Sequence, residues 1–153
     1  MNIDQIIMIM KYRVPLIFVG LLFLTLTSCQ AVNDAEQVAD EFHAKLDAHD
    51  HDFILDNLVD EEEIEVSGRE TWKNFLETVA SWGKISNREQ TNGFHIKTNN
   101  GLTTVKLEYT FENDYGLMYE ALVLVSRGSG YKVLVVSMNT DKIEVDAYTK
   151  DFD

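Results

Sequence analysis

The chain has 153 residues, which is enough for one domain and too few for two of ordinary size. With 45% hydrophobic and 25% charged residues, the composition excludes a disordered chain, and the single cysteine excludes an internal disulfide. The net charge of −13 repels the phosphates of nucleic acids and the headgroups of anionic lipids, so no nucleic-acid partner is expected.

The first 28 residues are typical of an export signal. A short basic segment at residues 10–13 precedes an uncharged, largely apolar run at residues 14–26. This run of 13 residues is too short to cross the core of a bilayer, which needs ~20 residues. We therefore predict a signal-peptide helix over residues 1–28. The start codon encodes one of three methionines, Met1, Met8 or Met10.

The segment Leu26-Thr27-Ser28-Cys29 resembles the lipobox of bacterial lipoprotein signals, with an aliphatic residue three positions before the cysteine and small residues directly ahead of it. The resemblance implies attachment of diacylglycerol to the Cys29 sulfur and cleavage before this residue. The mature chain would then be held to a membrane of the bacterial cell envelope by lipid, facing the periplasm, with residues 29–33 as a tether. The alternative is an uncleaved anchor helix with an incidental cysteine.

Two helices are predicted at the start of the mature chain. The first covers residues 34–48, where apolar residues recur at helical spacing. The second is shorter, covers residues 53–59 and takes Asp50 as its cap. The acidic run at residues 60–63 follows, and we read it as a solvated charge run.

A third helix is predicted from Ser67 to Gly83. Ser67 and Glu70 have the spacing of a capping box, and Gly83 is a natural stop. Its apolar residues recur three and four positions apart: Trp72, Phe75, Leu76, Val79 and Trp82.

After Gly83 the apolar period changes to two, which predicts β-strands. Four strands are expected, at residues 85–98, 104–111, 117–127 and 131–139. Short connections such as Asn99-Asn100-Gly101 favour consecutive hairpins. Residues 140–153 are polar and acidic, and we expect a loose C-terminal tail.

Helices followed by an antiparallel meander predict an α+β domain over residues 34–139, with the helices on one face of the sheet. The third and fourth strands are apolar on both faces, with Leu122 and Leu124 opposite Val123 and Val125 in the third. Either the sheet curls around a core, or its second face contacts a partner.

The order of elements over residues 34–139 resembles the nuclear transport factor 2-like superfamily, and within it small bacterial lipoproteins of unknown function. The resemblance depends on the acidic junction between the first two helices, on Trp82-Gly83 at the end of the third, and on the long meandering strands. It implies a cone-shaped, cystatin-like fold of three N-terminal helices packed on a curved four-stranded antiparallel sheet. Because the superfamily includes isomerases, dehydratases, binding modules and assembly domains, it does not determine the function. No catalytic position is carried over.

Histidines near the first helix junction are the candidate metal ligands. His49 and His51 stand among several carboxylates, but residues two apart on a helix point in different directions. The alternative is a helix junction with both histidines partly exposed. His43 and Asp47 have the spacing of an acid–base pair, or of the polar side of an amphipathic helix.

Aromatic residues on the third helix and the strands are the candidate binding residues. Trp72, Trp82, Tyr109 and Tyr119 would line an apolar pocket between the third helix and the sheet. Leu124 and Val136 would form a partner face. No phosphate loop, nucleophile elbow or zinc-protease motif occurs, so no catalytic residue and no cofactor is predicted.

These observations predict an exported lipoprotein with a small, non-enzymatic domain. The domain would bind a small apolar ligand or an envelope protein, or would form a homodimer through the sheet face. Two alternatives remain open: an enzyme that uses the apolar cone for proton transfer, and a lipoprotein that binds a divalent metal through His49 and His51.

Overall fold

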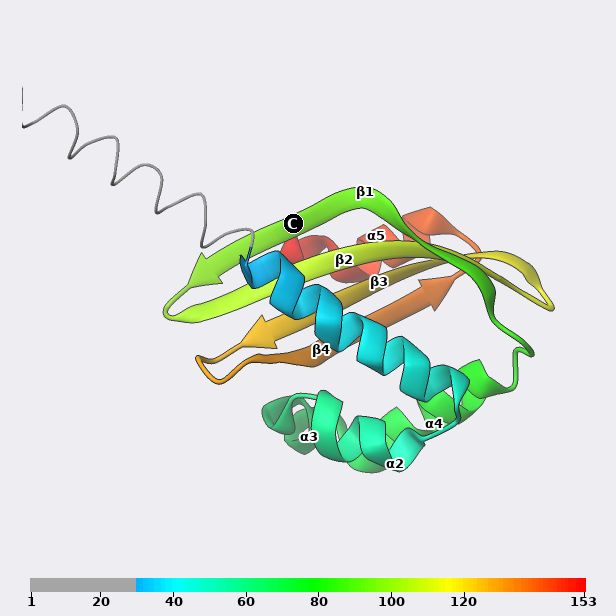
Figure 1. The fold of residues 1–153 in the computed structure, drawn as a ribbon, viewed down its shortest axis with the longest axis horizontal. Coiled ribbons are helices and arrows are strands. Elements are labelled where there is room, and N and C mark those ends of the chain that lie inside the picture. Colours follow the sequence, from blue (N-terminus) through cyan, green and yellow to red (C-terminus); the bar gives the residue numbers. More distant parts are fainter. Residues whose placement is uncertain (1–29) are drawn as a thin grey trace, which may run out of the picture. The chain divides into compact units, whose positions relative to one another are not determined.

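The structure, a computed structural model, describes residues 30–153, so the predicted signal peptide and Cys29 lie outside the described residues. The chain divides into residues 1–33 and residues 34–153, and the fold described below is that of the second unit. It is an α+β fold in which helices precede an antiparallel sheet, as the sequence predicts, and one more helix follows the sheet (Figure 1). Among the residues described, no helix combines the length and the apolar character needed to span a bilayer.

More helical segments precede the sheet than the three that the sequence predicts. The first helix ends at Asp47. It is followed by α2 (His51–Phe53), the π-helical turn η1 (Ile54–Leu58), α3 (Glu61–Ser67) and α4 (Arg69–Ala80). Of the run at residues 60–63, which was predicted to be solvated, Glu61 and Glu62 are exposed, whereas Asp60 is buried: its side chain accepts a hydrogen bond from the backbone N–H of Glu63 and caps α3. Glutamates in the first turn then stabilise α3 through the helix dipole.

The beginning of α4 differs from the predicted capping box. Its N-cap is Gly68, which makes no side-chain cap hydrogen bond, while the Ser67 hydroxyl donates to Glu63 within α3. The end of the helix is close to the prediction. The helix stops at Ala80, and Gly83 has a φ of 86°, in the left-handed region that favours glycine.

The sheet has four strands in the order β1-β2-β3-β4, and every neighbouring pair is antiparallel, which confirms the predicted meander. The strands are β1 (Ser86–Asn99), β2 (Leu102–Asn113), β3 (Gly116–Ser126) and β4 (Tyr131–Asn139). The register of β1 on β2 is interrupted twice, and that of β4 on β3 is interrupted once, at Leu134. One isolated parallel bridge joins Val59 to Val133 of β4.

The main core lies between the helices and one face of the sheet. Cross-strand neighbours such as Leu107, Leu122 and Val136 line this face. The helices contribute residues at helical spacing, among them Phe42, Leu46, Leu76 and Val79, all of them buried.

The other face of the sheet is covered by the C-terminal segment, so the prediction of a loose tail at residues 140–153 is wrong. This segment forms α5 (Lys142–Thr149) and a short 3-10 turn η2 (Lys150–Phe152), and α5 contacts β3 and β4. Figure 1 shows α5 behind the strands, on the side away from the first helix. Val145 of α5 and Val123 of β3 are both buried. The apolar character of both faces of β3 therefore has an explanation within this chain.

Candidate functional site

The structure does not bring the six predicted binding residues together. Trp72 and Val136 line one groove, whereas Tyr109 and Tyr119 line a different cavity. Leu124 is fully buried in the main core, so its prediction as part of a partner face is wrong: its side of β3 faces the helices of this chain. Trp82 is a half-buried residue packed against the same core.

The groove, here called the β4 groove, lies where the sequence predicts a pocket, between the helix that carries Trp72 and the sheet. Its volume is about 170 Å³, and the lining residues come from α3, α4, β4 and α5: Glu63, Ser67, Thr71, Trp72, Phe75, Leu134, Val135, Val136 and Tyr148. The rings of Trp72 and Phe75 pack edge to face, 6.1 Å apart. Since pockets that enclose a drug-sized molecule measure roughly 300–1,000 Å³, the β4 groove can hold only a small group or one side of a larger partner.

The strand beside this groove is at the edge of the sheet. Within the described residues, the outer edge of β4 takes part in one backbone hydrogen bond, from the N–H of Asp60 to the carbonyl oxygen of Val133, at 2.8 Å. An edge strand directs alternate backbone N–H and C=O groups away from the sheet, where another chain can pair with them. The β4 groove therefore combines apolar walls with a line of backbone donors and acceptors.

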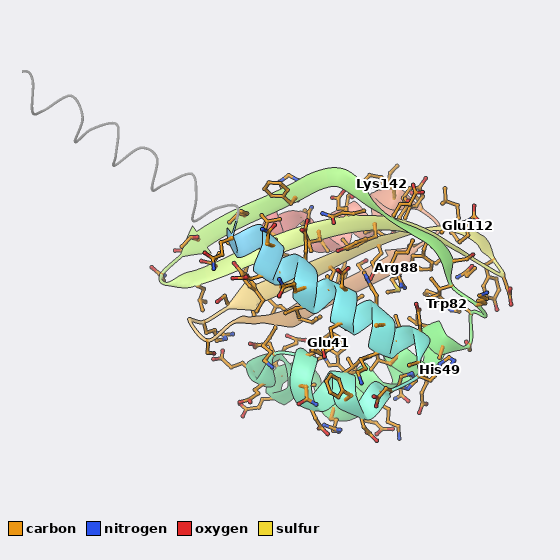
Figure 2. The ribbon with its side chains drawn as sticks, viewed as in Figure 1. Glu41, His49, Trp82, Arg88, Glu112 and Lys142 are labelled. Carbon is orange, nitrogen blue, oxygen red and sulfur yellow. The ribbon has the colours of Figure 1, made fainter. Side chains whose placement is uncertain are left out.

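A second cavity, of about 270 Å³, lies between the sheet and α5. Tyr109, Tyr119, Glu108 and Val145 are among the residues that line it. Lys142 of α5 closes one side through ion pairs with Asp146 at 2.9 Å and Glu108 at 3.2 Å (Figure 2). Hydrogen bonding to Asp146, and then to Glu108, raises the pKa of Lys142.

A buried polar cluster lies inside the fold, and the sequence analysis missed two of its members. Glu120 of β3, only 1% exposed, lies within hydrogen-bond distance of His43, with 3.0 Å between its Oε1 and the ring Nε2. The guanidinium of Arg88, on β1, lies 3.7 Å from the other oxygen of Glu120 and 3.4 Å from Asp47 (Figure 2). The ring of Tyr109 packs edge to face on His43 at 4.8 Å, and burial raises the pKa of its hydroxyl.

The contacts in this cluster differ from the acid–base pair that was predicted on the first helix. His43 is paired with Glu120 rather than with Asp47, so the pair predicted at helical spacing is not formed. The sequence does offer a way to find Glu120. It lies two and four positions before Leu122 and Leu124 on β3, so its side chain is on the same, core-facing side of the strand. A carboxylate next to an imidazole can transfer protons. Here both side chains are buried, and Glu120 is also among the residues that line the cavity beside α5.

The two candidate metal ligands lie at the end of the first helix. The rings of His49 and His51 are 6.1 Å apart and nearly perpendicular. In the part of the chain that the structure describes, no three metal-binding side chains converge on one point. Asp50 occupies the N-cap position of α2, as predicted, but its side chain makes no capping hydrogen bond; its carboxylate accepts from Lys45 at 2.9 Å, and this hydrogen bond lowers the pKa of Asp50.

Comparison of the chain with protein-family models gives no match. Comparison with curated proteins also gives none.

Proposed function

We propose that this chain is an exported lipoprotein, anchored through Cys29, and that its folded unit is a non-catalytic domain that binds a partner in the β4 groove. The observation that carries the proposal is the position of this groove. Half-exposed apolar residues on the outer edge of β4 face Trp72 and Tyr148 there. Soluble folds usually cover or charge such an edge.

We also propose that the fold is of the cone-shaped, nuclear transport factor 2-like kind. Helices on one face of a four-stranded antiparallel meander support this assignment. The proposal that the domain is non-catalytic rests on the burial of the Glu120–His43 pair, whose side chains are 0% and 7% exposed. An enzyme that uses a cone for proton transfer needs that pair to be open to substrate.

The anchor is tested by labelling growing bacterial cells with an alkyne-bearing fatty acid. The wild-type chain is expected to take up label and to sediment with membranes, because the acyl chains bury in the bilayer. Cys29→Ser is expected to lose both properties, whereas Ser28→Ala, which keeps a small residue before the cysteine, is expected to retain them. Label on Cys29→Ser, or an unlabelled wild type with its leader intact, would contradict the proposal.

The binding role is tested by photo-cross-linking in intact cells. Tyr148 borders the β4 groove and Tyr115 lies in the hairpin between β2 and β3, and the two are equally exposed, at 69% and 70%. Benzoylphenylalanine at position 148 is expected to give a discrete cross-linked product, and the same residue at position 115 is not. Equal products from both positions, or none from either, would remove the groove as the binding site.

A further inference from the structure

Resting on the proposed function of the β4 groove, we propose that its occupant is an extended segment of a different protein, with basic and apolar residues in alternation. This segment adds to the sheet as a new strand beside β4. Its backbone pairs with the free edge, and alternate side chains enter the apolar walls of the groove.

The free part of the edge begins after Val133. The chain itself covers the start of β4, through the bridge between Val59 and Val133 and the hydrogen bond from Asp60. The bulge that interrupts β4 is at Leu134, directly after this covered part. Residues 135–139 follow in regular register with β3, so the regular stretch of the edge spans roughly 16 Å, at about 3.3 Å per residue.

The first half of the opposite edge, on β1, carries features that prevent pairing. β1 is bulged twice, and charged and amide side chains occupy residues 87–90, whereas residues 94–99 are in regular register with β2 and include the exposed Phe94 and Ile96. Such bulges and charges are the usual means by which proteins protect an edge. β4 instead runs Val133-Leu134-Val135-Val136. The apolar walls that Trp72, Phe75 and Tyr148 form beside β4 point to this strand as the edge that receives another.

The walls of the groove fit the two faces of an added strand. Val136 lies on the helix side of the sheet, where Trp72 and Phe75 stand, whereas Tyr148 of α5 belongs to the opposite side. Because side chains of a strand alternate between faces, one set would contact the Trp72 wall and the other would contact Tyr148.

The carboxylates around the β4 groove indicate which kind of partner it binds. Glu63 lines the β4 groove, and the rest of α3 adds Glu61, Glu62 and Glu65. Glu144 lies one helical turn from Tyr148 on α5. A second copy of this chain would bring the same carboxylates and a net charge of −13 to the interface, so self-pairing is disfavoured. A basic segment is attracted to the same rim.

The test uses the full chain in phosphatidylcholine nanodiscs and three capped octapeptides: alternating Lys-Val, alternating Glu-Val, and the Lys-Val peptide with proline at its central valine. The readout is amide hydrogen exchange at residues 135–139. Lys-Val is expected to bind saturably and to slow exchange there, because its backbone pairs with β4. The acidic and proline peptides are expected to bind at least about tenfold more weakly, because one is repelled and the other lacks a pairing N–H.

Two variants locate the site. Tyr148→Ala is expected to weaken Lys-Val binding about fivefold by removing one wall, while Tyr115→Ala, equally exposed, leaves it unchanged. Equal binding of the proline peptide, or binding without slowed exchange, means electrostatic adsorption and overturns strand addition. Slow exchange at residues 135–139 that appears with protein concentration and without peptide identifies a second copy as the occupant, and this also overturns it. If no peptide binds but position 148 still cross-links in cells, strand addition is wrong and the proposed function stands.

Discussion

Glu120 is a carboxylate inside an apolar core, and its neighbours make this position tolerable. An isolated buried charge is costly, so such a group is found with partners of opposite charge and with hydrogen bonds. His43 supplies a hydrogen bond to Glu120, at 3.0 Å, and Arg88 supplies the opposite charge, at 3.7 Å. The three side chains come from the first helix, β1 and β3. The cluster therefore fixes how the helix sits on the sheet.

Removal of this carboxylate should destabilise the domain strongly. Glu120→Ala leaves the Arg88 guanidinium buried with only Asp47 nearby, so the free energy of unfolding is expected to fall by roughly 3–5 kcal/mol. Urea denaturation followed by circular dichroism measures it. Glu41→Ala, on the exposed side of the same helix as His43, is the control and should change stability by less than about 0.5 kcal/mol. A loss below about 1 kcal/mol for Glu120→Ala would show that the cluster contributes little.

Gly83 offers a second test at this scale. Its φ of 86° and the close approach of the Asp114 side chain leave little room for a methyl group. Gly101, in the β1–β2 hairpin, has a φ of 81° with no atom near the position of a Cβ. Both alanine substitutions should cost about 1–2 kcal/mol through backbone strain, and Gly83→Ala should cost more. Equal losses in urea denaturation would mean that Asp114 moves aside freely.

At the scale of elements, the sequence predicted what long periodic patterns encode. The period of two fixed four strands in hairpin order, and spacings of three and four located α4. The two helices that were missed are short and acidic, and each begins at an aspartate cap, Asp60 for α3 and Asp141 for α5. A cap followed by acidic residues was visible in the sequence, but helices this short form mainly through tertiary contacts, which α3 makes with α4 and α5 makes with β3 and β4.

The candidate site was predictable only in part, because its residues lie on separate elements. Trp72 and Val136 were identified from the apolar pattern of their own elements, and they do meet in the β4 groove. Tyr148 could not be assigned to it while residues 140–153 were read as a tail. Nor does periodicity show which face of β3 is covered: Leu124 faces the helices, and α5 covers the opposite face.

The role of α5 can be tested with two apolar residues of the same helix. Val145 is 2% exposed and Ile143 is 74% exposed. Val145→Asp places a carboxylate against the sheet, so the free energy of unfolding is expected to fall by about 3 kcal/mol, with increased aggregation as the outer face is uncovered. Ile143→Asp should change it by less than about 0.5 kcal/mol. If both variants behave alike in urea denaturation, α5 does not cover the sheet in solution.

For the whole molecule, charge is the dominant feature. The sequence has 26 acidic and 13 basic residues, and in the described residues many of the basic side chains already have an acidic partner. The excess carboxylates therefore repel one another in the folded unit, which keeps copies apart and weakens the compact state. Local ion pairs act in the opposite direction, but exposed pairs of this kind are each worth only about 0–1 kcal/mol.

Salt distinguishes these two contributions. Raising the ionic strength from about 0.01 to 0.15 M shortens the Debye length from roughly 30 to 8 Å, which screens distant repulsion more than close pairs. We therefore expect the free energy of unfolding to rise by about 1 kcal/mol, a Tm increase of roughly 3 °C for a domain of this size. Calorimetry of the wild type, Glu65→Gln and Glu65→Lys checks the cause, since Glu65 is exposed near the end of α3. Stability at low salt should increase along this series while the dependence on salt decreases. A wild type that loses stability as salt is added would mean that its ion pairs outweigh the net repulsion.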